Sequence, residues 1–131
     1  DPVESRPMPS PKGLLLLAHG ARDSRWAQPF EAIVEQMRDA QPDLAVELAF
    51  LEFMAPDLIA AGRRLAESGC CSVEIMPLFL GMGGHVRNQV PALVAQLEAE
   101  HAAVHWTLQP TIGEADAVIE AIAAEALRRL E

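Results

Sequence analysis

The chain has 131 residues, half of them hydrophobic, which is enough to bury the core of one domain without disulfides or a structural metal. Its net charge of −9 repels polyanions, which excludes typical nucleic-acid binders. Cys70 and Cys71 are the only cysteines, so neither a disulfide framework nor a cysteine-rich zinc site is expected. No apolar run reaches the roughly 18 residues of a membrane span. We expect a soluble, cytoplasmic protein with no membrane partner.

Residues 1–12 are rich in proline and polar side chains, which predicts a flexible tail ahead of a single domain over residues 13–131. The tail lacks the apolar centre of a signal peptide. After it, short apolar runs alternate with longer segments of helical period, as in parallel βαβ units. The first strand is expected over residues 14–18. The helix that follows has apolar residues at three-four-seven spacing: Phe30, Ile33, Val34 and Met37.

The second strand is expected over residues 45–51, followed by a helix that Pro56 opens and Gly69 ends. The third strand covers residues 72–80, and the fourth covers residues 104–109. A helix between them uses Val90, Leu93, Val94 and Leu97 as its apolar stripe. The last helix is expected to begin with a capping box formed by Thr111 and Glu114. Its buried face is predicted from the spacing of four residues: Ile119, Ile122, Ala126 and Leu130.

Four βα units predict an α/β fold, a four-stranded parallel sheet with helices on both faces. Ligands of such sheets bind at the carboxyl edge. His19 directly follows the first strand, Glu52 follows the second, and His85 lies just past the third. If the first strand lies between the other two, as in the flavodoxin-like order, the three backbones span roughly 10 Å. We therefore expect all three side chains at one edge.

These side chains suit the handling of a divalent metal ion. Two imidazoles and a carboxylate bind cobalt, nickel or ferrous iron and leave coordination positions open, which metal transfer requires. Histidine is also the side chain that accepts protons near neutral pH. One histidine can therefore hold a metal while the other removes protons from the group that receives it.

Three segments, in this order, resemble the small sirohydrochlorin cobaltochelatase family. They are His19-Gly20-Ala21-Arg22-Asp23, Phe50-Leu51-Glu52, and Phe79-Leu80-Gly81-Met82-Gly83-Gly84-His85 with the later Val90-Pro91. The likeness runs from about Gly13 to the C-terminus. It implies a flavodoxin-like chelatase lobe of the class II type. Such an enzyme inserts a divalent metal into sirohydrochlorin or a related tetrapyrrole in cobalamin or siroheme-type biosynthesis.

The resemblance also implies roles and partners. His19 matches the proton acceptor or metal contact, His85 the metal-binding histidine, and Glu52 an accessory acidic ligand. The metal, cobalt first and iron or nickel as options, is a substrate, and no tightly bound cofactor is implied. The tetrapyrrole lies between two lobes, so a one-lobe chain implies a homodimer. The family usually has serine where Ala21 stands and aspartate where Gln89 stands.

Sirohydrochlorin is a polycarboxylate, so cationic side chains near the histidines are candidate contacts. Arg22, Arg25 and Arg87 can form charge-assisted hydrogen bonds with its carboxylates or can be ordinary surface residues. The loop of Met82, Gly83 and Gly84 is expected to contact the substrate. Apolar side chains near the strand ends either face the macrocycle or belong to the core, and these are Met54, Phe79, Leu80 and Met82.

Two rival functions remain open at this stage. A non-catalytic module that carries a metal or tetrapyrrole would use the same residues, but it would not turn over. A nucleotide-binding module would use the glycine loop at Gly81–Gly84, although that loop lacks the lysine and hydroxyl residue of a P-loop. Cys70 and Cys71 are expected to point to opposite faces of the sheet as structural residues.

Overall fold

A computed structural model describes residues 11–131, so residues 1–10 of the expected tail lie outside the described residues. Lys12, the last residue of that expected tail, already belongs to the first strand. The described helices include none that is long and apolar enough to cross a membrane.

Four parallel strands form one sheet in the order β2-β1-β3-β4, which confirms the predicted flavodoxin-like order. The strands are β1 (Lys12–Ala18), β2 (Ala45–Phe50), β3 (Ser72–Pro77) and β4 (His105–Leu108). β1 lies next to both β2 and β3, and its Ala18 is in register with Phe50. The ends of the strands that precede His19 and Glu52 therefore lie next to each other at the carboxyl edge.

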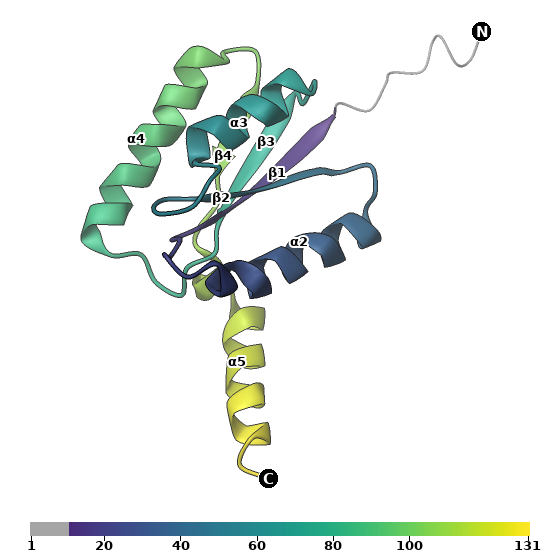
Figure 1. The fold of residues 1–131 in the computed structure, drawn as a ribbon, viewed down its shortest axis with the longest axis vertical. Helices are drawn as coiled ribbons and strands as arrows, with labels where there is room; N and C mark the ends of the chain where they lie inside the picture. Colours follow the sequence, from purple (N-terminus) through teal and green to yellow (C-terminus); the bar gives the residue numbers. More distant parts are fainter. Residues whose placement is uncertain (1–10) are drawn as a thin grey trace, which may run out of the picture.

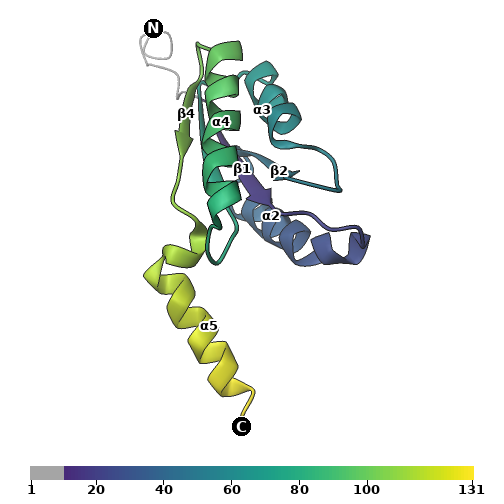
Figure 2. The same ribbon diagram turned by 90° about the vertical axis from the view of Figure 1, so that its left-hand side faces the viewer.

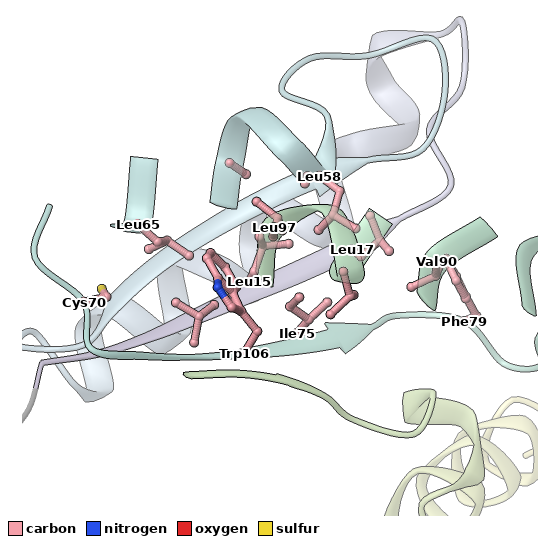
Figure 3. Close-up of a cluster of buried hydrophobic side chains, with 14 residues drawn as sticks. Leu15, Leu17, Leu58, Leu65, Cys70, Ile75, Phe79, Val90, Leu97 and Trp106 are labelled. Carbon is pink, nitrogen blue, oxygen red and sulfur yellow. The ribbon is translucent and has the colours of Figure 1, made fainter. Parts of the chain in front are cut away.

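Helices cover both faces of β1, which explains why its sequence is an unbroken apolar run. On one face, α3 (Leu58–Glu67) and α4 (Gly84–Glu100) pack over Leu15 and Leu17, both fully buried. On the other face, Val34 of α2 (Gln28–Ala40) packs against Leu16. Figure 1 shows the sheet between these helices, and Figure 3 shows the larger cluster, to which β3 and β4 contribute Ile75 and Trp106.

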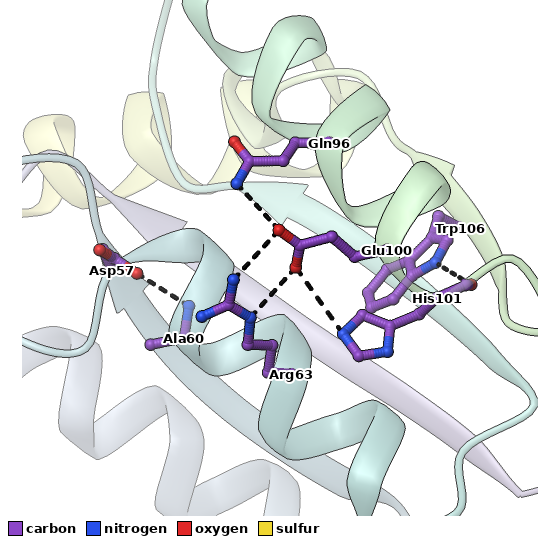
Figure 4. A network of polar contacts seen from close by, with 7 residues as sticks. All are labelled: Asp57, Ala60, Arg63, Gln96, Glu100, His101 and Trp106. Carbon is purple, nitrogen blue, oxygen red and sulfur yellow. Dashed lines mark hydrogen bonds and ion pairs between the residues drawn. The ribbon is translucent and has the colours of Figure 1, made fainter.

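A polar network fixes α3 against the last turn of α4 (Figure 4). Arg63 donates hydrogen bonds to both carboxylate oxygens of Glu100, at 3.1 and 3.0 Å, and Gln96 donates a third at 3.1 Å. His101 follows as the C-cap of α4, and its carbonyl accepts a hydrogen bond from the Trp106 indole at 3.2 Å. The network joins two helices whose apolar sides already meet in the core.

The two ends of α3 differ in how well they match the sequence prediction, which fails at Pro56 and holds at Gly69. Pro56 does not open the helix: its peptide bond with Ala55 is cis, and Asp57 is the N-cap, accepting a hydrogen bond from the Ala60 N–H at 2.8 Å. Gly69 follows the helix with a φ of 98°, as expected near a C-terminal cap. Cys70 is buried and Cys71 is exposed, in agreement with opposite orientations.

The segment after β4 differs most from expectation. Thr111 and Glu114 do not form a capping box, because a short turn of 3-10 helix, η2 (Ile112–Glu114), precedes α5 (Asp116–Arg128). Thr111 is instead buried, and its hydroxyl pairs with the backbone of Phe79 in the loop after β3. The Thr111 hydroxyl therefore bonds to the backbone of a distant residue, Phe79, and not to the nearby helix N-terminus that the sequence predicted.

α5 does not bury the face that its sequence predicts. The helix has no buried residue, and it extends away from the body of the domain in both views (Figures 1 and 2). Ile119 is 53% exposed, Ile122 48% and Leu130 82%, and Ala126 is exposed as well. The prediction was wrong because periodicity identifies an apolar face but not the surface that covers it.

Candidate functional site at the carboxyl edge

His19 lies at the first position after β1, exposed to solvent. Its imidazole stacks on the ring of Phe79, with the centroids 4.1 Å apart and the planes inclined by 26°. Phe79 is only 2% exposed, so a buried ring from the loop after β3 supports an exposed ring from the loop after β1. The contact orients His19, and it places Phe79 in the core rather than on a substrate wall.

The loops after β1 and β2 are joined by backbone hydrogen bonds. The Glu52 N–H donates to the His19 carbonyl at 2.9 Å, and the Leu51 N–H donates to the Ala18 carbonyl at 3.0 Å. Gly20 has a φ of 94°, and a Cβ atom at this position would fall on the Glu52 carbonyl oxygen. Only glycine fits both the conformation and the close approach. The structure therefore fixes the exposed Glu52 next to the histidine loop.

Phe53, which the sequence analysis missed, is the most unusual residue of this edge. It is 61% exposed, and its φ of 67° is a left-handed conformation that a bulky side chain rarely adopts. The Met54 N–H donates to the Glu52 carbonyl at 2.8 Å, which closes a tight γ-turn around Phe53. The Arg22 guanidinium lies 5.0 Å from the centroid of its ring. Strained, exposed residues often mark functional sites, whereas the sequence offered only one more apolar residue after a strand.

His85 lies in the first turn of α4, exposed, after the glycine loop. A Cβ atom added to Gly81, Gly83 or Gly84 would meet no atom of the chain within 4 Å. These glycines are therefore not required by packing within the described chain, and they leave the backbone open to a ligand from outside. A cavity of about 620 Å³ lies beside the loop and includes Met82 and Arg87 in its lining.

The three arginines differ in what they contact. Arg25 forms a bidentate ion pair with Asp23. The hydrogen bonds between the two side chains raise the pKa of Arg25 and lower the pKa of Asp23. Arg22 and Arg87 pair with no carboxylate within residues 11–131, although Arg87 donates to the Met82 carbonyl at 3.2 Å. Arg22 and Arg87 are thus better placed than Arg25 to receive an anionic ligand.

Other aromatic and apolar residues near this edge differ in their burial and contacts. Trp26 packs against Phe30 and Phe50, with ring centroids 4.6 and 6.4 Å away, so it belongs to the domain core around α2. Met54 packs into the same small cluster, whereas Leu80 is 72% exposed beside the glycine loop. Leu80 is therefore the one of these apolar residues that is free to contact a ligand.

The edge does not by itself form a closed metal site. Within the described residues, no three His, Cys, Asp or Glu side chains gather closely enough to hold a metal ion. His19, Glu52 and His85 follow three adjacent strands, but they remain separate exposed side chains. A larger hollow of about 770 Å³ lies between α2 and β2, and neither histidine lines it. The arrangement suits an open site that a further molecule completes.

Comparisons with known proteins agree with this geometry. A sequence model of the CbiX family matches residues 13–129. A sirohydrochlorin cobaltochelatase of Methanopyrus kandleri is 31% identical over 87 residues, which are 66% of this chain and 60% of the relative. The chain thus matches less than two thirds of that protein's length.

Two solved structures have the same fold. A Marinobacter aquaeolei CbiX protein, described as one of cobalamin biosynthesis, superposes with a TM-score of 0.80 and 34% identity, covering 92% of this chain and 98% of that one. The sirohydrochlorin chelatase SirB of Bacillus subtilis, solved with cobalt, has a TM-score of 0.78 at 19% identity over 90% of this chain and 50% of SirB. With a family match that spans nearly every described residue, the chain belongs to the CbiX family.

Proposed function

We propose that this chain inserts a divalent metal ion into sirohydrochlorin or a related tetrapyrrole, in cobalamin or siroheme-type biosynthesis. Cobalt is the first candidate metal, and iron and nickel are the alternatives, because the same nitrogen and oxygen ligands accept all three. The observation that supports this most is a CbiX-family match over residues 13–129 that includes two exposed histidines after adjacent strands of the sheet.

The reaction must balance protons as well as charge. A free-base tetrapyrrole loses two pyrrole N–H protons when its four nitrogen atoms bind M²⁺. A single imidazole accepts one proton at a time, so it must pass the first proton to solvent before it removes the second. We assign proton removal to His19, because its stacking on Phe79 holds the imidazole in a fixed orientation. We assign metal delivery to His85, since the open glycine loop lets a ligand approach it. Glu52 is the accessory oxygen ligand.

Substrate binding is assigned to the side chains around these histidines. Arg22 and Arg87 would pair with peripheral carboxylates, which offsets the repulsion between a polyanionic substrate and a chain of net charge −9. The exposed ring of Phe53 offers a flat apolar surface for the macrocycle. Arg25 contributes less, because Asp23 already occupies its guanidinium.

We further propose that the active species is a homodimer. The chain has the fold of SirB over 50% of that protein's length, so a second copy would supply another lobe of the same fold. A single copy leaves the candidate ligands exposed on one side. A second lobe would enclose the macrocycle and exclude water from it.

The test is an anaerobic insertion assay with sirohydrochlorin and Co²⁺, Fe²⁺ or Ni²⁺, at a substrate excess over protein. His19→Ala and His85→Ala should each lose most of the protein-dependent rate. His105→Ala is the matched control, since His105 is an exposed histidine at the start of β4, at the opposite edge of the sheet. Its rate should equal that of the wild type.

The outcomes separate the candidate functions. Equal rates in all four proteins would refute the proposed roles of the histidines. Tight binding of tetrapyrrole or metal without turnover would identify a carrier instead. Affinity for phosphate compounds that survives both histidine substitutions would favour a nucleotide-binding module.

A further inference from the structure

α5 is an amphipathic helix without a partner surface. Within the described chain it packs chiefly against η2, the short turn that precedes it. Four of the seven exposed large hydrophobic residues of residues 11–131 belong to α5 and the two residues after it. Ile119, Ile122, Ala126 and Leu130 follow one another at spacings of three and four residues, so they form one apolar stripe. An exposed apolar stripe of this size is typical of a surface that binds another protein.

The junction before α5 holds the helix away from its own sheet. The buried Thr111 hydroxyl accepts a hydrogen bond from the Phe79 N–H at 3.2 Å and donates one to the Phe79 carbonyl at 2.5 Å. The Gly113 N–H donates to the same carbonyl at 2.9 Å, and a Cβ atom on Gly113 would overlap the Leu80 backbone. These contacts fix η2, the turn against which α5 packs, to the loop after β3.

The same chain has a sheet surface that lacks a helix. α4 packs over the Trp106 side of β4, while on the opposite side α2 packs chiefly against β2 and reaches β1. Strand alternation then leaves Glu74 and Thr107 on a side of β3 and β4 that no described helix covers closely. Met76 lies on the same side, where it packs against the cluster of Leu16, Val34 and Val46. Glu74 is exposed, and Met76 and Thr107 are half-buried. We call these residues, with Gln109, the open sheet face.

We propose that α5 of one subunit packs across the open sheet face of a second copy, which returns its own α5 in the same way. This inference deepens the proposed homodimer and rests on it. A helix of 13 residues is about 20 Å long, and β3, with six residues, is also about 20 Å long. The apolar stripe and the open sheet face therefore match in length.

The buried area is sufficient for a stable dimer. Half the surface of a cylinder about 20 Å long and 10 Å wide is roughly 300 Å², and the sheet beneath it loses a similar area. Two reciprocal contacts then bury about 1,200 Å², which is the lower limit for specific protein interfaces. The contact is self-complementary, as a two-fold axis requires.

The first test measures mass by light scattering and fold by circular dichroism. The wild type should have twice the 14.2 kDa chain mass. Ile119→Glu/Ile122→Glu should be a folded monomer, because the charges fall in the stripe. Ala121→Glu/Ala124→Glu adds the same charge to the opposite, exposed side of α5 and should remain a dimer. A stripe variant that stays dimeric, or a control that becomes monomeric, would overturn the proposal.

A cross-linking experiment separates exchange from folding back. In a Cys71→Ser background, Thr107→Cys and Ala126→Cys place one thiol on the open sheet face and one on the stripe. A flexible thiol cross-linker should join two chains on a denaturing gel if α5 is exchanged. Cross-links within single chains, or none, would refute exchange. Because neither readout uses turnover, a negative result here leaves the metal-insertion assay to decide the proposed function separately.

Discussion

Thr111→Val tests whether one buried hydroxyl joins the last turn of the domain to the loop that supports His19. Thr111 is 5% exposed, and its hydroxyl makes two hydrogen bonds with the backbone of Phe79. Valine keeps the volume of the side chain and removes only the hydroxyl. The substitution therefore isolates the hydrogen bonds from packing.

The magnitude depends on which backbone groups lose every partner. The Phe79 carbonyl keeps the Gly113 N–H at 2.9 Å, so it loses one of two hydrogen bonds, worth about 1 kcal/mol. The Phe79 N–H loses its recorded partner inside a buried site, which costs about 1–3 kcal/mol. The added methyl group regains less than about 1 kcal/mol. We expect a net loss of about 2–3 kcal/mol, or roughly 10 °C in Tm for a domain of this size.

Urea unfolding at one fixed protein concentration measures this loss, since the proposed dimer would make stability depend on concentration. Thr111→Ser is the comparison, because it keeps the hydroxyl and removes a methyl group at a cost of about 1 kcal/mol. The reasoning fails if serine destabilises the protein as much as valine does. That result would mean that packing, and not the hydroxyl, holds the junction.

Three further predictions concern separate parts of the domain. Phe53→Gly relieves the strain of the left-handed backbone, so the free energy of unfolding should stay within about 1 kcal/mol of the wild-type value. Tetrapyrrole binding, measured by fluorescence, should weaken several-fold, and an unchanged affinity would remove Phe53 from the site. Gly62→Ala should destabilise by about 1 kcal/mol in urea, because overpacking outweighs a helix-propensity gain of about 1 kcal/mol. The new Cβ would lie 2.6 Å from a methyl carbon of the fully buried Leu97, and a gain in stability would contradict this packing. Hydrogen bonds from Arg63 keep the pKa of Glu100 below its ordinary value of 4.5. The pair therefore stabilises the fold fully at pH values above 4.5, and this stabilisation is lost as the pH falls through the lowered pKa of Glu100. Glu100→Gln should flatten that acid-side decline in Tm, and an unchanged decline would show that the pair contributes nothing.

The sheet was predictable because its signal is local and redundant. Leu14 to Leu17 form a short apolar run bounded by turn residues, which is typical of a strand covered on both faces. His19 and Glu52 then follow neighbouring strands on the condition of a flavodoxin-like sheet order, which the structure has. The position of α5 was not predictable in this way, because the stripe that includes Ile119 is the same whether its partner is the same chain or another.

The candidate site shows a similar division. The histidines stand out because their side-chain chemistry is rare and their places in the topology are informative. Phe53 does not, since its left-handed φ and its contact with Arg22 arise only after the loop is fixed by the Glu52 and Met54 backbones. Thr111 was assigned to a local cap because its real partner, Phe79, is 32 residues away in sequence.

The backbones of the loops after β1 and β2 are joined at Gly20, which approaches the Glu52 carbonyl closely, and by the hydrogen bond from the Glu52 N–H to the His19 carbonyl. The side chains at positions 19 and 52 contribute nothing to that link, so they can be exchanged while the loops stay in place. In the proposed site, the side chains at these two positions could therefore be replaced one at a time while the backbone between them stays in place. For protein engineers, a carboxylate or a thiol at either position is therefore a small experiment rather than a redesign.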